Sequence, residues 1–206
     1  MIIGITGGIG SGKSVISKQL RKMGYSVYDT DSEAKRIIVE DATVREQMTA
    51  LFGEEVYQDG VYQTSFVAQQ VFADKNLLAK LNAIVHPAVK QDIITKFRSS
   101  GVTSEPSTPS EPLNSHPRGL FFIECAILFQ AGFDVLCDKV VAVTAPEDIR
   151  LERVIARDHS DMNKVRARMR AQEAEKDLLR ADIVVNNDGQ TTIPTLCEEI
   201  IHLLTK

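Results

Sequence analysis

The 206-residue sequence has no tryptophan, only three cysteines and no long hydrophobic run. The cysteines are odd in number and none has C-x-x-C spacing, which argues against a disulfide framework and against a zinc site. No apolar run approaches the length of a membrane span, and an apolar strand follows Met1 directly, so we expect no signal peptide. These absences together predict a cytoplasmic protein that does not associate with membranes.

An excess of positive charge is also lacking, because 24 lysines and arginines face 28 aspartates and glutamates and give a net charge of −4. We therefore expect no nucleic-acid partner. A chain of this length can bury one sizeable core with a small appended lobe, and it carries no signal for an oligomeric state.

Residues 7–14, GGIGSGKS, match the pattern G-x-x-x-x-G-K-[ST] directly after the apolar run Ile2–Thr6. A phosphate cradle needs a strand that delivers the chain, glycines that allow a tight turn and a helix whose free N–H groups face the anion. Helical spacing follows over Lys13–Met23, so the motif predicts a nucleotide phosphate site. The alternative is a glycine-rich turn that binds nothing. The residues expected to contact ATP are Gly8, Gly10, Ser11, Gly12, Lys13, Ser14 and Val15.

Two residues of this motif carry chemical expectations. Lys13 places a cation where charge moves during phosphoryl transfer, and Ser14 offers a hydroxyl to Mg²⁺. A cation in the first turn of a helix is unfavourable to the helix dipole, so an anionic ligand explains Lys13 better than a solvated lysine does.

Further strands are expected as continuous apolar runs separated by helices, a pattern typical of a parallel sheet covered on both sides. They cover Tyr25–Tyr28, Leu120–Ile123, Lys139–Thr144 and Ile183–Val185. The sequence therefore predicts an α/β protein with a five-stranded parallel sheet flanked by helices.

The block 43–99 has helical spacing and predicts a helical lobe beside the sheet. Within it, His86 and Pro87 are expected to separate two helical stretches, and a lone histidine is more often structural than catalytic. Residues 101–119 are rich in proline, serine and threonine, so we expect a mobile surface loop there. This segment is either a tolerated insertion or a regulatory arm.

Acidic residues close two of the expected strands. Asp29 and Asp31 follow the second strand and Glu124 follows the third, and ligands of open α/β sheets sit outside the carboxyl ends of the strands. Such carboxylates can orient an acceptor hydroxyl, take its proton or hold Mg²⁺ through water. The alternatives are helix-start residues and an edge ion pair, since Thr30 and Glu33 form a capping-box pattern there.

Arginines gather after the fourth strand. Arg150, Arg153 and Arg157 share one face of a predicted helix, which suits a mobile lid that closes over ATP. The neighbouring acidic residues equally allow a solvated, salt-bridged face. Three more arginines follow on the next segment: Arg166, Arg168 and Arg170.

Several motifs occur together and in one order: ITGGIGSGKS, YDTD, VHPAV, AILFQAGF, RLERVIARD, RMRAQ and ADIVVNN. In this combination the chain resembles the dephospho-CoA kinase family, from Ile2 to about Asn187. The resemblance implies transfer of the ATP γ-phosphoryl group to the 3′-hydroxyl of dephospho-CoA, the last step of coenzyme A synthesis. It also implies ATP and dephospho-CoA as substrates, Mg²⁺ as cofactor and a P-loop fold of the nucleoside-monophosphate-kinase type.

The family's functional residues carry over by position. Asp31 matches the proposed base with Asp29 beside it, and His86 lies in the motif of the CoA-binding domain. Arg153 and Arg157 match arginines of the lid. The implied regions are a nucleotide-binding core (1–30, 119–145 and 180–206), a helical acceptor lobe (31–100), a mobile loop (101–118) and a lid (146–179).

The chain departs from the family at three places. The segment Gln63–Phe72 has none of the arginines usual there, Gln130 stands where an acidic residue is common, and the insertion 101–119 is longer than usual. Other interpretations are a related kinase with another acceptor, a GTP-binding switch or a non-catalytic adaptor. A switch would need N-K-x-D, but Val165 and Arg166 follow the only Asn-Lys pair. The sequence leaves open ATP or GTP preference and which lid arginine contacts the transferred phosphate.

Overall fold

The computed structural model describes residues 1–102, 119–159, 161–172 and 179–206. The chain forms two compact units, one of Met1–Tyr28 with Ser99–Lys206 and the other of Asp29–Arg98. Most of the segment expected as a mobile loop, 103–118, lies outside the described residues. In the described part of the chain, no helix is both long and apolar enough to cross a membrane.

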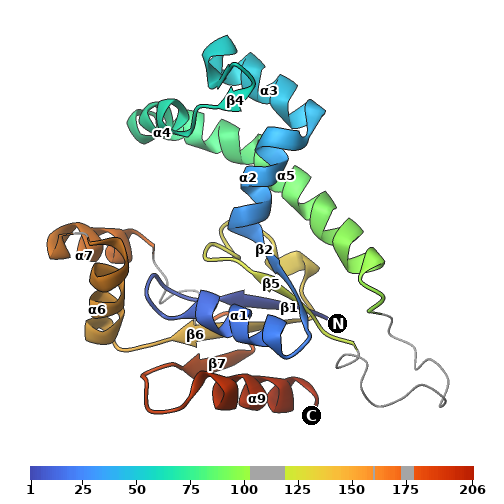
Figure 1. Cartoon of the computed structure of the whole chain (residues 1–206), viewed down its shortest axis with the longest axis vertical. Helices are drawn as coiled ribbons and strands as arrows, with labels where there is room; N and C mark the ends of the chain where they lie inside the picture. Colours follow the sequence, from blue (N-terminus) through green and yellow to red (C-terminus); the bar gives the residue numbers. More distant parts are fainter. Residues whose placement is uncertain (103–118, 160, 173–178) are drawn as a thin grey trace. The chain divides into compact units, whose positions relative to one another are not determined.

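The first unit is built on a five-stranded sheet with the order β2-β5-β1-β6-β7 (Figure 1). The strands are β1 (Ile2–Thr6), β2 (Ser26–Asp29), β5 (Phe121–Glu124), β6 (Lys139–Thr144) and β7 (Ile183–Asn186). Central β1 pairs in parallel with β5 and β6, and β7 pairs in parallel with β6. Parallel neighbours need long crossover connections, which the intervening helices provide. The predicted five-stranded parallel sheet is confirmed.

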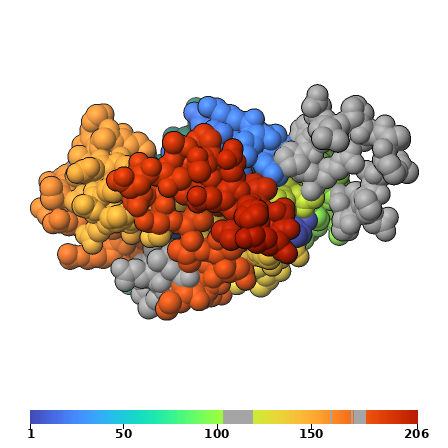
Figure 2. Space-filling model, turned by 90° about the horizontal axis from the view of Figure 1, so that it is seen from below, coloured from blue at the N-terminus to red at the C-terminus, as the bar shows by residue number. Residues whose placement is uncertain are grey.

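One face of this sheet is covered by α1 (Lys13–Lys22) and α9 (Ile193–Leu204). Ile3 and Ile5 of β1 lie two residues apart and point to this face, where Leu20 of α1 packs against the same cluster. These three side chains are fully buried, and each contributes about 1.5–3 kcal/mol. Figure 2 shows the C-terminal residues, in red, spread over the outer side of this unit.

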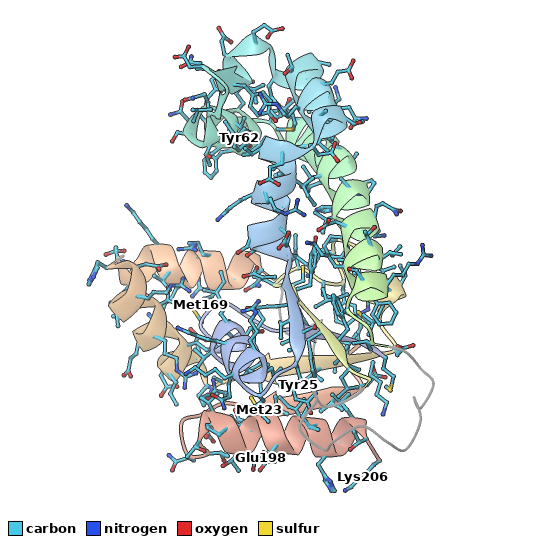
Figure 3. The ribbon with its side chains drawn as sticks, turned by 45° about the vertical axis from the view of Figure 1, so that its right-hand side comes forward. Met23, Tyr25, Tyr62, Met169, Glu198 and Lys206 are labelled. Atoms are coloured by element: carbon cyan, nitrogen blue, oxygen red, sulfur yellow. The ribbon has the colours of Figure 1, made fainter. Side chains whose placement is uncertain are left out.

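The turn after α1 fixes where β2 begins. Gly24 has a φ of 90°, and Tyr25 N donates to Leu20 O at 3.0 Å, the hydrogen bond of a Schellman turn. The ring of Tyr25, labelled in Figure 3, then meets the ring of Phe122 edge-on at a centroid distance of 5.4 Å. Gly24 therefore ends the first helix and directs the chain into β2.

Two further helices of the first unit are α6 (Glu147–Asp158) and α7 (Met162–Ala171), which follow β6; a short 3-10 helix, η2 (Asp134–Leu136), precedes it. The two helices share a small apolar cluster of their own. Its buried members are Leu151, Val154, Val165 and Met169, and Ile9 packs against it.

The second unit is mainly helical. It consists of α2 (Thr30–Glu40), α3 (Ala42–Phe52), η1 (Glu54–Val56), β3 (Tyr57–Gln58), β4 (Val61–Tyr62), α4 (Thr64–Ala73) and most of α5 (Lys75–Ser99). The antiparallel hairpin of β3 and β4 was not predicted. Asp59 and Gly60 form its turn with φ values of 50° and 78°, as an Asp-Gly hairpin turn requires.

Two predicted boundaries in this unit are wrong. Helix α2 is capped by Asp29 rather than by Thr30, because the Asp29 carboxylate accepts from the backbone N–H groups of Asp31 and Ser32. His86 and Pro87 do not separate two helices, since α5 continues through Pro87. Proline lacks the N–H that would bond four residues back, but the helix on both sides supplies enough hydrogen bonds and buried residues to continue.

Candidate active site

The phosphate-binding motif forms the turn between β1 and α1. Gly10 and Gly12 have φ values of 81° and 95°, a region that other residues rarely adopt. A Cβ atom at Gly10 would collide with the carbonyl oxygen of Arg150, and one at Gly12 with Asn187 Nδ2. Glycine therefore lets the turn pass directly against α6 and against the residues that follow β7. The other predicted contacts, Gly8, Ser11 and Val15, lie in this turn and at the start of α1.

Lys13 is held inside this turn. The residue is only 9% exposed. Its Nζ donates to Gly7 O at 2.8 Å and to Gly8 O at 3.4 Å. A buried ammonium needs such partners, and the helix dipole disfavours a cation at this end of α1. The result is a fixed positive charge beside N–H groups that suit an anion.

Ser14 and Glu124 lie close enough to share a cation. Ser14 Oγ donates to Glu124 Oε1 at 2.7 Å, and Glu124 is a buried residue at the end of β5. Hydroxyl and carboxylate oxygens are ligands that suit Mg²⁺, which is commonly held by few protein groups plus substrate phosphates. Among the residues that the structure describes, no group of three or more His, Cys, Asp or Glu side chains could hold a metal ion alone. The donor set therefore fits Mg²⁺ that arrives with a phosphate ligand.

Arg153 connects α6 to the phosphate-binding turn. Its Nη1 donates to Asn187 O at 3.0 Å and, more weakly, to Ser11 O at 3.5 Å. The buried Asn187 donates from Nδ2 to the same Ser11 oxygen at 2.9 Å. Asn187 ends the motif ADIVVNN, but no role was predicted for its side chain, because a motif does not identify a partner 176 residues away.

The remaining arginines of this region do not share one environment. Arg157 is exposed and forms an ion pair with Asp158 at 2.6 Å, which lowers the pKa of that carboxyl group. Arg168 also pairs with Asp158, at 3.3 Å, and Arg166 lies 4.0 Å from Glu147. Of the two predicted lid arginines, the structure thus brings Arg153 to the phosphate-binding turn and pairs Arg157 with a carboxylate.

The predicted acidic pair lies where β2 becomes α2. Asp29 Oδ1 accepts from Asp31 N at 3.1 Å and from Ser32 N at 3.2 Å, so its carboxylate serves as the helix cap. Asp31 is exposed in the first turn of α2. Of the two carboxylates, Asp29 is therefore engaged by the backbone, whereas Asp31 presents its side chain at the surface of the second unit.

His86 lies half-buried in α5, also in the second unit. Burial, assisted by the positive charge of Lys90, lowers the pKa of His86. The neutral imidazole is therefore favoured in the folded protein.

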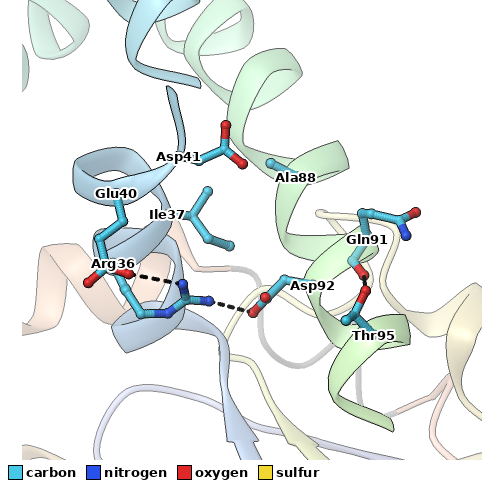
Figure 4. Close-up of a pocket in the computed structure, with 8 residues that line it drawn as sticks. All are labelled: Arg36, Ile37, Glu40, Asp41, Ala88, Gln91, Asp92 and Thr95. Atoms are coloured by element: carbon cyan, nitrogen blue, oxygen red, sulfur yellow. Dashed lines mark hydrogen bonds and ion pairs between the residues drawn. The ribbon is translucent and has the colours of Figure 1, made fainter. Parts of the chain in front are cut away.

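A groove of about 450 Å³ lies between α2 and α5 (Figure 4). Arg36 donates there to Asp92 at 2.8 Å and to Glu40 at 3.2 Å, and Asp41 adds a third carboxylate to the lining. The single guanidinium is thus already neutralised. This groove does not suit an anionic ligand.

Comparisons with known proteins agree with this arrangement. A family model described as dephospho-CoA kinase matches residues 1–192. A curated dephospho-CoA kinase of Porphyromonas gingivalis is 40% identical over 207 residues, which covers 99% of this chain and 95% of that protein. A crystal structure of a Thermus thermophilus protein has a TM-score of 0.77 and 32% identity, with 100% of this chain and 96% of that chain covered. The dephospho-CoA kinase from Campylobacter jejuni shares the fold, with a TM-score of 0.66 and 21% identity over 98% of this chain and 96% of that one.

Proposed function

The chain belongs to the dephospho-CoA kinase family, whose members catalyse the final ATP-dependent step of coenzyme A synthesis, and on this premise we propose how its residues divide the work. The turn over Gly8–Val15 binds the phosphates of ATP with Mg²⁺. Asp31 takes the proton of the acceptor's 3′-hydroxyl, and Arg153 and Arg157 of the lid stabilise the transferred phosphoryl group.

The contact set around the phosphate-binding turn carries this proposal. Lys13 and Arg153 donate to carbonyl groups of the phosphate-binding turn and supply cationic donors that an anion can use. Ser14 donates its only hydroxyl hydrogen to Glu124, which leaves its oxygen lone pairs for a metal ion. Phosphoryl transfer needs little covalent work from the protein, because positioning and charge stabilisation supply most of the acceleration. A buried lysine at a helix N-terminus supplies both.

In the proposed step, the 3′-oxygen of dephospho-CoA forms a bond to the γ-phosphorus of ATP, and the bond from that phosphorus to the bridging oxygen of ADP breaks. The hydroxyl proton passes to the carboxylate of Asp31, which must reach hydrogen-bond distance of the acceptor. Lys13 stays on the phosphate oxygens and stabilises the charge that develops on ADP.

Ser14 and Glu124 are the residues that would hold Mg²⁺, Ser14 directly and Glu124 directly or through water. When bound, Mg²⁺ neutralises part of the phosphate charge and fixes the orientation of the β- and γ-phosphates. The 2.7 Å contact between the two side chains supports this assignment.

We assign the acceptor to the helical lobe over 31–100, with Asp29, Asp31 and His86 in its binding region. The groove between α2 and α5 is excluded as the place for the acceptor's phosphates because carboxylates neutralise Arg36 there. Helix α4 contains no arginine, so the acceptor phosphates need cations from elsewhere in the lobe.

The test is ADP release with ATP and Mg²⁺, measured with and without dephospho-CoA, with the product identified by mass. We expect ADP release to depend on the acceptor and the product to gain one phosphate. ATP binding without any stimulation by dephospho-CoA would contradict the acceptor assignment while leaving the phosphate site intact. Stimulation by a nucleoside or sugar acceptor instead would identify a related kinase with another substrate.

A further inference from the structure

Both backbone polar groups of Ile9 are held by side chains from outside the phosphate-binding turn. Ile9 N donates to Gln172 Oε1 at 2.6 Å, and Ile9 O accepts from Arg150 Nε at 2.9 Å. Arg150 lies on α6, and Gln172 directly follows α7. The backbone of one residue of the turn is therefore hydrogen-bonded both to a side chain of α6 and to the side chain that follows α7.

The side chain of Ile9 adds a third attachment to the same segment. It packs against the apolar cluster that joins α6 and α7, which includes Val154 and Met169 (Met169 is labelled in Figure 3). The turn also passes so close to α6 that a Cβ atom at Gly10 would collide with Arg150 O. Packing and hydrogen bonds thus fix the two peptide groups on either side of Ile9.

The side-chain amide of Gln172 makes a second hydrogen bond. Its Nε2 donates to Ala126 O at 3.1 Å, so the one amide bridges the phosphate-binding turn and the residues that follow β5. Glu124, two residues before Ala126, accepts from Ser14 at the other end of the turn. The amide is suited to this position because it offers one acceptor and two donors on a single side chain.

We infer that Gln172 is a positioning residue. Its hydrogen bond to Ile9 N keeps the phosphate-binding turn in its observed shape. Ile9 N donates to Gln172, whereas the first N–H groups of a helix such as α1 are the ones that suit an anion. Gln172 acts through Ile9 and does not itself contact the reacting atoms. The expected effect on ATP binding rests on the proposed ATP site. The two hydrogen bonds of the Gln172 amide, which we call the Gln172 clamp, are present without nucleotide.

Gln172→Met removes both hydrogen bonds at nearly constant length and volume. We expect hydrogen exchange at the Ile9 amide to accelerate about tenfold, because one partly buried hydrogen bond of this kind is lost. Exchange at the Ile16 amide, which bonds to Gly12 O at 3.2 Å at the N-terminal end of α1, is expected to stay unchanged. The Kd for ATP with Mg²⁺ is expected to rise about tenfold, while the KM for dephospho-CoA stays within about twofold.

Gln172→Glu tests the two hydrogen bonds of the Gln172 amide separately. A carboxylate oxygen still accepts from Ile9 N, whereas the donor to Ala126 O is gone, so Ile9 exchange is expected to remain slow. Gln47→Met, at an exposed position of α3, is the matched control and leaves exchange and kinetics as in the original protein.

Equal Ile9 exchange rates in Gln172→Met and the original protein would overturn the inference. Loss of exchange protection at Ile9 and Ile16 together would also overturn it, since Gln172 would then support general stability. The ATP affinity of the original protein tests the proposed phosphate site, whereas Ile9 exchange in Gln172→Met tests the role of Gln172. The two proposals can therefore fail separately.

Discussion

Ser14 Oγ donates a hydrogen bond of 2.7 Å to Glu124 Oε1, which joins the first turn of α1 to the end of β5. These two oxygens are of the kind that Mg²⁺ prefers, and we proposed above that they hold it. We predict that Glu124→Gln raises the Mg²⁺ concentration needed for half-maximal rate about 10–100-fold, the range found when a group that orients a metal ligand is lost. Titration of the rate with Mg²⁺ at saturating substrates measures this change. An unchanged Mg²⁺ dependence would remove Glu124 from the metal site.

Lys13 is predicted to serve both phosphate binding and chemistry. Lys13→Ala should lower kcat/KM at least about 100-fold, because it removes a preorganised cation from the transferred phosphate. Steady-state rates and ATP affinity measure the two contributions. Lys18→Ala, at an exposed position of the same helix, is the control. If Lys13→Ala kept both the affinity and the rate, the phosphate-site assignment would be wrong.

The two lid arginines are predicted to differ in their effect on ATP. Arg153 donates to Asn187 O and Ser11 O, so Arg153→Gln should raise the KM for ATP about tenfold and also lower kcat. Arg157 forms its ion pair with Asp158, so Arg157→Gln should lower kcat with little change in the KM for ATP. Steady-state kinetics of the two variants compare them directly. Equal effects on the KM for ATP would contradict the separate roles.

His86 is predicted to make stability depend on pH. Burial, with the charge of Lys90, lowers its pKa below 6.5 in the folded protein, so the unfolded chain binds the proton more readily. The contribution is fully present above the unfolded pKa and is lost as pH falls through about 6.5 toward the folded value. Chemical denaturation between about pH 7 and about pH 5 measures this loss, and His86→Gln should reduce the slope. An identical slope in that variant would assign the pH dependence to other groups.

The phosphate-binding turn could be predicted because its parts are neighbours in sequence. A strand, a run of glycines and a helix start fall within residues 2–14, so Lys13 and Ser14 were identified from spacing alone. Glu124 was also predicted because it ends an apolar strand. Arg153 was predicted because it shares a helix face with Arg150 and Arg157 and matches a lid arginine of the family. The parallel sheet followed from the continuous apolar character of the same strands.

Long-range partners could not be predicted. The amides of Asn187 and Gln172 meet the phosphate-binding turn across separations of 176 and 163 residues. Both end motifs that carry the family resemblance, ADIVVNN and RMRAQ, but neither motif shows which residue its amide contacts. The helix boundary predicted at Pro87 was wrong, because α5 continues through this residue although proline usually interrupts helices. The Asp59-Gly60 turn carried a hairpin signal, but its strands of two residues each are too short for alternation to appear.

The measurement that tests the account most directly is single-turnover phosphoryl transfer by Asp31→Asn, with ATP affinity measured on the same sample. Asp59→Asn is the control, because it makes the same chemical change at an exposed turn whose positive φ asparagine tolerates. We predict that Asp31→Asn binds ATP nearly as the original protein does and transfers the phosphoryl group about 10²–10⁴-fold more slowly, the contribution of a positioned base. Near-normal transfer by Asp31→Asn would contradict the proposed base and leave the acceptor hydroxyl without its partner.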